Sequence, residues 1–285
     1  MSIKKIIKNK MTVKKFIKTK ILCLVFFIPV FSYSAWQGAG TQADPWQITS
    51  RQCLEALADS VARPLEPMWS QNKYFILMND ITDSVRISIG GNSRMFYGSF
   101  DGNGKEITLA INGSNAHLFT ILTWGSRVDN LSVTGYVIRT GTGGYGTAGI
   151  AGHNYGTITN CINSAKIIGA RFTGGICGRN SGVVSNCINI GTVKGNDVVG
   201  GISGDIVMLS GGAILNSANY GFVYGVSNFV GGITGVITNN TTASNNFNSG
   251  VVVGTSNVGC IVGFREPNAI LINNHYDKQM CGEEE

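Results

Sequence analysis

A five-residue pattern, Gly-Gly-Ile-Xaa-Gly, recurs through the second half of the chain and limits what the chain can fold into. Ala148 and Cys260 each replace one glycine, and the five copies are 148–152, 174–178, 200–204, 231–235 and 259–263. The first three copies are evenly spaced, and the last two follow after slightly longer intervals. Self-similarity at such a period is typical of a stacked repeat, in which each unit buries its apolar side against its neighbours.

Each copy is followed by two further elements. The first is an Asn-Xaa-Xaa-Asn segment, at 160–163, 186–189, 216–219 and 245–248, and the second is a short apolar stretch between small residues, such as 191–195. Three short strands per repeat, with glycine and asparagine at the corners, predict an all-β fold, a single-stranded parallel β-helix or solenoid. We expect the asparagines to adopt the left-handed corner conformation and to form hydrogen-bonded ladders along the stack.

The chain before the repeats contains a helix signature. Thr49 and Gln52 form a capping-box pattern, and an apolar face follows that Pro64 ends: Cys53, Leu54, Leu57, Ala58 and Val61. A short amphipathic helix here can cap the open end of the first coil. The expected organisation is therefore a signal peptide (1–34), an N-terminal cap with the first strands (35–99), the β-helix repeats (100–275) and a C-terminal tail (276–285).

The amino terminus has the pattern of a secretory signal peptide. Eight lysines fall within 1–20, a short apolar run follows at 21–31, and small residues surround Ser34 and Ala35. Without these eight lysines, 14 Lys and Arg stand against 16 Asp and Glu, a formal charge of −2. We therefore expect an exported protein, secreted or on the cell surface. We expect no nucleic-acid partner and no transmembrane segment after cleavage.

The glycine-rich strand, the asparagine segment and the Gly-Xaa-Val-Xaa-Gly strand together resemble the GLUG repeat family. This family occurs in bacterial surface and secreted proteins, including non-catalytic parts of some immunoglobulin A-cleaving metallopeptidases. The segments Gly38–Ile48 and Phe100–Gly104 look like what commonly precedes such repeats. The resemblance covers most of the chain after the leader. It implies a β-helix and defines no catalytic residue.

Motifs of common catalytic and metal sites are absent from the sequence. The three histidines are scattered (His117, His153 and His275), and no His-Glu-Xaa-Xaa-His, Gly-Xaa-Ser-Xaa-Gly or Cys-Xaa-Xaa-Cys occurs. Asp101 and Asp129 each lie beside turn residues, and a turn role is favoured over calcium binding. We expect no enzyme activity, no cofactor and no metal.

The period nevertheless places two pairs of opposite charges on adjacent coils. Arg171 precedes Asp197 by one repeat, and Arg179 precedes Asp205 by the same interval. One interpretation is two solvated ion pairs, each contributing at most about 1 kcal/mol. The other interpretation adds Tyr145 and His153, which lie one coil earlier, and makes a polar patch that binds a sugar or carboxylate. The six members of this patch are Tyr145, Arg171, Asp197, His153, Arg179 and Asp205.

Six cysteines follow the leader. Cys161 and Cys187 occupy the same column on neighbouring coils, either as two buried thiols or as a disulfide. A second disulfide, between Cys260 and Cys281, is a further possibility.

The sequence thus predicts a non-catalytic exported β-helix that serves in cell-surface adhesion or binds glycans or host and cell-surface proteins. Long regular stacks offer extended surfaces for such recognition. The alternative is a polysaccharide lyase or glycoside hydrolase on a β-helix scaffold, an inference by analogy with the fold.

Overall fold

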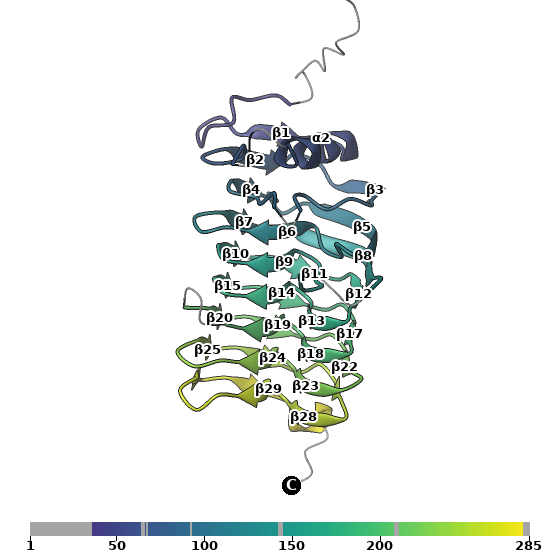
Figure 1. Ribbon diagram of the computed structural model, residues 1–285, viewed down its shortest axis with the longest axis vertical. Coiled ribbons are helices and arrows are strands. Elements are labelled where there is room, and N and C mark those ends of the chain that lie inside the picture. Colours follow the sequence, from purple (N-terminus) through teal and green to yellow (C-terminus); the bar gives the residue numbers. More distant parts are fainter. Residues whose placement is uncertain are drawn as a thin grey trace, which may run out of the picture. The chain divides into compact units, whose positions relative to one another are not determined.

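The computed structural model describes residues 36–281, except 64–65, 67, 92, 142–144 and 208–210. The predicted signal peptide and the last four residues of the predicted tail lie outside the described residues. The described chain is nearly all β, with parallel strands stacked as a solenoid of about eight turns and a single α-helix (Figure 1). The predicted parallel β-helix is confirmed.

Four parallel sheets run along the stack. Sheet A has nine strands, β1 (Trp46–Ile48), β2 (Tyr74–Leu77), β4 (Ser99–Asp101), β7 (Arg127–Asp129), β10 (Thr157–Thr159), β15 (Val183–Ser185), β20 (Ala213–Leu215), β25 (Thr242–Ser244) and β30 (Ile270–Ile272). Sheet C has six, β6 (Phe119–Leu122), β9 (Ala151–Asn154), β14 (Cys177–Asn180), β19 (Ser203–Ile206), β24 (Thr234–Ile237) and β29 (Val262–Arg265). Sheet D has four, β13 (Arg171–Gly174), β18 (Asp197–Gly200), β23 (Asn228–Gly231) and β28 (Ser256–Gly259).

Sheet B has twelve strands and is two strands wide over most of its length. It starts with β3 (Ile81–Val85), β5 (Glu106–Gly113) and β8 (Ser132–Arg139). One column continues as β11 (Ile162–Asn163), β16 (Ile188–Asn189), β21 (Ala218–Asn219), β26 (Phe247–Asn248) and β31 (His275–Tyr276). The other continues as β12 (Lys166–Ile168), β17 (Val193–Gly195), β22 (Val223–Gly225) and β27 (Val252–Val253). A 3₁₀ turn, η2 (Lys278–Met280), follows β31.

A full coil contains five strands, not the three that the sequence predicts. From β13 the chain passes through β14, β15, β16 and β17 before it reaches β18, one coil further along the stack. The repeated isoleucine lies in the tight turn between a sheet D strand and a sheet C strand, rather than inside one strand. The glycine-rich stretch forms two strands where the sequence predicts one, because it has little side-chain periodicity to mark the turn. The segment before each asparagine pair adds the fifth strand, which belongs to sheet A and is β15 in this coil.

The isoleucines nevertheless form the predicted interior column. Ile150, Ile176, Ile202 and Ile233 are fully buried, and Ile261 is nearly so. The amide of each of the first four donates to the carbonyl of the next isoleucine along the stack. Successive coils are therefore in register at the centre of the repeat.

The asparagines act as predicted. The first asparagine of each pair is left-handed, with φ between 50° and 55° at Asn160, Asn186, Asn216, Asn245 and the isolated copy Asn273. The second forms a buried ladder, in which the side-chain amides of Asn163, Asn189 and Asn219 donate to the side-chain oxygens of the next rung at 2.7, 2.7 and 2.8 Å. Asparagine suits both positions because it tolerates φ > 0 and carries a donor and an acceptor.

The middle glycine of the repeated pattern lies in the bend between sheets D and C, as Gly175 does, but the glycines are not there to supply a left-handed backbone. None of them has a positive φ. They are required by close approach instead: a Cβ on Gly178 would lie 2.4 Å from the Cα of Gly146, and one on Gly175 would lie 2.5 Å from Asn189 Oδ1. The backbone of sheet D thus lies directly against that of sheet C, and the middle glycine makes room for the asparagine ladder.

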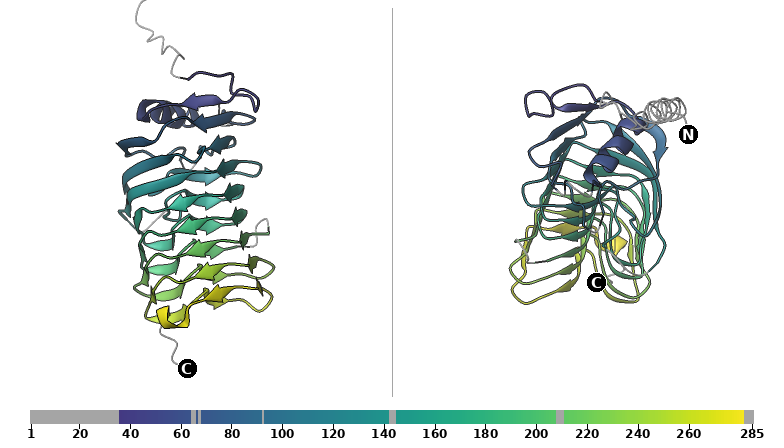
Figure 2. Two further views of the ribbon diagram at one scale, coloured as in Figure 1. Left: turned by 180° about the vertical axis from the view of Figure 1, so that it is seen from behind. Right: turned by 45° about the horizontal axis from the view of Figure 1, so that its top comes forward.

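The N-terminal end of the stack is covered as predicted. Helix α2 (Arg51–Val61) lies across the opening (Figure 2) and buries the expected apolar face. Its cap is Ser50, one residue later than predicted, because the Ser50 hydroxyl rather than that of Thr49 accepts from the Cys53 amide. Four aromatic rings pack beside it, and their centroids lie 5.2–6.2 Å apart: Trp36, Trp46, Trp69 and Phe75.

The proposed disulfide between Cys161 and Cys187 is wrong. Both are free and buried, and each thiol donates to a carbonyl of its own coil, Thr159 O at 3.1 Å and Ser185 O at 3.2 Å. Residues stacked in one column of a parallel sheet point the same way, so two thiols lie side by side rather than facing each other. The second possible disulfide, between Cys260 and Cys281, is present and ties the last coil to the turn after η2.

The close approach of sheets C and D predicts a strong effect of one methyl group. Gly178→Ala forces the two backbones apart and should lower the free energy of unfolding by about 2–4 kcal/mol. Gly113→Ala is the matched control, because a Cβ there meets nothing within 4 Å. Chemical denaturation of both variants measures the difference, and equal stability would contradict the packing described.

Candidate functional site

The six residues predicted as a patch lie on sheets C and D and on the segment before β9. The register pairs Arg171 with Asp197, and it places Arg179 between His153 and Asp205. Thr147 bridges Thr173, which puts Tyr145 one coil before Arg171. The structure therefore confirms every vertical neighbour that the repeat period predicts for these residues.

The two ion pairs differ in their environment. Arg171 Nε lies 3.5 Å from Asp197 Oδ2 at the surface, where the Arg171 side chain is 65% exposed. Arg179 Nε lies 3.1 Å from Asp205 Oδ2, and the Asp205 side chain is only 4% exposed. The prediction of two solvated pairs thus holds for the first and is wrong for the second, because the short Asp205 side chain stays within the packed layer of sheets C and D.

Burial governs the titration of this buried pair. It raises the pKa of Asp205 from its ordinary 3.8 to about 6, and the Arg179 guanidinium opposes the shift only in part. Burial, together with the positive charge of Arg179, lowers the pKa of His153 to about 4. His153 is therefore neutral at physiological pH, and its Nε2 lies 3.1 Å from Ser181 Oγ.

Phe172 connects the two arginines. Its ring centroid lies 4.6 Å from the Arg171 guanidinium carbon and 4.3 Å from that of Arg179. Its backbone is left-handed, with φ of 55°, as are the equivalent residues Val198, Phe229 and Asn257. Such a conformation is unusual for a bulky residue and persists only where the surroundings impose it. Here it directs the Phe172 ring toward Arg179 on sheet C.

Two further aromatic residues extend the patch. Tyr155 stacks on His153 at 4.2 Å between centroids, and Trp124 lies 4.8 Å from Tyr155. Trp124 is 65% exposed, the largest exposure among the large apolar side chains of the described chain. The aromatic–arginine patch is thus the six predicted residues together with Trp124, Tyr155 and Phe172.

Sequence reasoning missed these three aromatic residues. Tyr155 lies two residues after His153 and so on the same side of the extended chain, a signal that was available. Trp124 comes from the turn after β6, before the first regular repeat, and Phe172 depends on a backbone conformation that no side-chain pattern indicates.

The patch offers cations, hydrogen-bonding groups and aromatic faces. Both arginines contact the Phe172 ring, and their side chains are 65% and 32% exposed. Within the described residues, no group of three His, Cys, Asp or Glu side chains could hold a metal ion. Burial raises the pKa of the nearby Cys177 thiol, so this cysteine stays protonated.

A concave site separate from the aromatic–arginine patch lies on the outer face of sheet A. A groove of about 230 Å³ runs over the start of this sheet. Asp101 and Asp129 stand in register on β4 and β7 and line it together with Arg127, Tyr74 and Gln42. Asp101 Oδ1 accepts from the Asn103 amide at 2.7 Å, which confirms its turn role. Asp129 Oδ2 lies 2.7 Å from an Arg127 nitrogen.

Comparison with known proteins supports the fold. The chain superimposes on the crystal structure of a "putative immunoglobulin A1 protease" from Bacteroides ovatus with a TM-score of 0.69. The match covers 85% of this chain and 78% of that chain at 22% sequence identity, and at this identity it shows a common β-solenoid fold. No protein-family model and no curated protein sequence matches the chain.

Within the described residues, none of the helices has the length and apolar character needed to span a bilayer.

The buried carboxyl of Asp205 makes a testable contribution to pH dependence. Because its folded pKa exceeds its unfolded value, the folded protein binds more protons between about pH 4 and pH 6, and stability from this group falls as pH rises through that window. Asp205→Asn removes the effect. The stability of the variant relative to wild type should rise by about 2 kcal/mol between pH 4 and pH 6.5.

Urea denaturation at several pH values measures this difference. Asp197→Asn, at the exposed pair, is the control, and its difference from wild type should vary by less than about 1 kcal/mol over the same range. Parallel pH profiles for Asp205→Asn and wild type would contradict the assignment.

Proposed function

We propose that this chain is an exported, non-catalytic binding protein of the GLUG repeat type, which uses its aromatic–arginine patch to hold glycans at or outside the cell surface. The observation that carries the proposal is the solvent-exposed Trp124 ring beside Tyr155, next to two arginines on a rigid stack. Tryptophan and tyrosine present an apolar ring and a polar edge, which suits the mixed surface of a sugar. Arginine adds fixed hydrogen-bond donors for hydroxyl or carboxylate groups.

The rigidity of the scaffold favours binding. Every strand of sheets C and D is hydrogen-bonded into a parallel stack, so the patch residues on these strands are held in place before a ligand arrives. Pre-organisation lowers the entropy cost of association.

Two features support export. The basic and apolar leader at 1–34 has the order of a signal peptide. The disulfide between Cys260 and Cys281 is the kind of bond that persists in an oxidising compartment outside the cytoplasm.

Glycan-array screening followed by calorimetry tests the binding role. Trp124→Ala, and separately the double change Arg171→Ala with Arg179→Ala, should each weaken binding of an array-positive glycan at least tenfold, about 1.4 kcal/mol. Tyr136→Ala and Arg86→Ala, at exposed positions outside the patch, serve as matched controls and should bind like wild type. Absence of any glycan ligand, or equal binding by all variants, would refute the proposal.

The groove on sheet A favours a second candidate, a glycoside hydrolase. Neighbouring parallel strands lie about 4.8 Å apart, so the register of β4 and β7 places Asp101 and Asp129 side by side on adjacent strands, and glycosidases use a pair of carboxyl groups. Tyr74 and Gln42 at its wall supply a ring and an amide for a sugar.

A panel of soluble polysaccharides, assayed for new reducing ends, tests this candidate. If the groove is catalytic, Asp101→Asn and Asp129→Asn should each lower turnover at least a hundredfold, while Asp83→Asn, on strand β3, should not. No turnover by the wild type on any substrate would leave the binding role as the sole proposal.

A further inference from the structure

The outer face of sheet B becomes apolar over its later coils. Seven large apolar side chains project from it, each 37–54% exposed: Ile162, Ile190, Tyr220, Phe222, Phe247, Val251 and Val253. The register places Ile162 and Phe247 in one column, with Ile188 and Ala218 between them, and it pairs Tyr224 with Val253 in another column. We call these seven residues the apolar face.

The fold does not require apolar residues at these positions. One outward column contains Lys166, Thr192, Phe222 and Val251 on successive coils, so its two earlier residues are polar. The inward residues of the same strands, Val193 and Val223, are buried in every coil and make up the core. An outward-facing lysine or threonine is therefore compatible with the coil, and the later aromatic residues leave their surface in water without adding to the interior.

Aromatic rings are concentrated at the centre of the face. Tyr220, Phe222 and Tyr224 alternate along one coil with Gly221 and the buried Val223, so all three rings project outward. The Tyr220 ring lies 6.0 Å from that of Phe247, and the Phe222 ring lies 6.4 Å from that of Tyr224. Central aromatic residues with a more polar surround are the arrangement found in protein interfaces.

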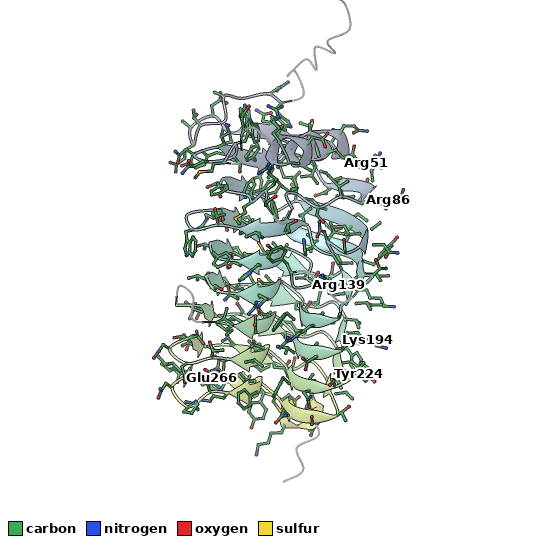
Figure 3. The ribbon with its side chains drawn as sticks, viewed as in Figure 1. Arg51, Arg86, Arg139, Lys194, Tyr224 and Glu266 are labelled. Atoms are coloured by element: carbon green, nitrogen blue, oxygen red, sulfur yellow. A yellow bond between two sulfur atoms is a disulfide. The ribbon has the colours of Figure 1, made fainter. Side chains whose placement is uncertain are left out.

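One charged group, Lys194, lies beside the apolar face in the column of Tyr224 and Val253. Lys194 and Tyr224 are one above the other at the margin of sheet B (Figure 3), and the Lys194 ammonium lies 5.0 Å from the Tyr224 ring centroid. A lysine in this place can keep its charge in water while its stem covers apolar surface.

The area of the face is compared with what each partner of a standard dimer buries. Seven large side chains that are two-fifths to half exposed present roughly 500 Å² of apolar surface, at the upper end of the largest patch on monomeric proteins. Adding the smaller outward residues between them brings the total toward the roughly 800 Å² that each partner buries in a standard interface.

We propose that the apolar face is a homodimer interface, in which sheet B of one copy packs against sheet B of a second copy about a two-fold axis near the Tyr220–Phe222 row. The aromatic–arginine patch lies on sheets C and D, so dimerisation leaves it accessible and presents it twice. This inference is independent of which ligand the patch binds.

Sedimentation equilibrium of the purified protein tests the proposal. Wild type should be dimeric at micromolar concentration, and Phe222→Lys should raise the dimer dissociation constant at least a hundredfold. Phe264→Lys is the matched control, because Phe264 has the same 42% exposure but lies on sheet C, and it should not change the constant. Circular dichroism confirms that both variants fold.

A cross-linking experiment locates the axis. Residues near a two-fold axis meet their own copies, so Tyr220→Cys should form a disulfide-linked dimer under mild oxidation, and Trp124→Cys should not. A monomeric wild type at 100 µM would overturn the proposal, as would a dimer that Phe222→Lys leaves intact. Binding of a monomer through this face to an insoluble polysaccharide or to lipid vesicles would also overturn it.

Discussion

Parallel hydrogen bonding between neighbouring coils is the interaction on which the whole molecule depends. Once one coil is fixed above the next, residues a repeat apart become vertical neighbours, and each side-chain column acquires its partners. The asparagine ladder strengthens this register, because a shift by one residue would separate the buried amides of Asn163, Asn189 and Asn219. The interior isoleucines and the surface ion pairs follow from the same alignment.

The second constraint is the contact between the backbones of sheets C and D. Glycine at positions such as Gly178 and Gly204 removes the side chains that would keep these sheets apart. The tight layer buries Asp205 and imposes the left-handed conformation of Phe172. The environment of the aromatic–arginine patch therefore follows from the glycines of the repeat, although none of them belongs to the patch.

The sequence predicts the features that follow from the repeat period, but it does not predict those that follow from how the sheets pack against each other. Register could be derived from spacing, so Arg179 above His153 and Asp205 above Arg179 were both predictable. The number of strands per coil, the true role of the glycines and the burial of Asp205 could not be derived, because they depend on how two sheets pack in the third dimension. Trp124 was not predicted for another reason: it lies before the first regular repeat, and the repeats contain no equivalent residue.

Each coil has constrained positions and variable positions, and this separation affects how the surface can change during evolution. Columns occupied by Asn189 or Gly178 tolerate little variation, whereas the outward column of sheet B carries lysine, threonine, phenylalanine and valine in successive turns of one molecule. New surface chemistry can therefore arise one row at a time on an unchanged frame. Recombination between the gene segments that encode different coils could then combine outward side chains in new ways on the same backbone fold.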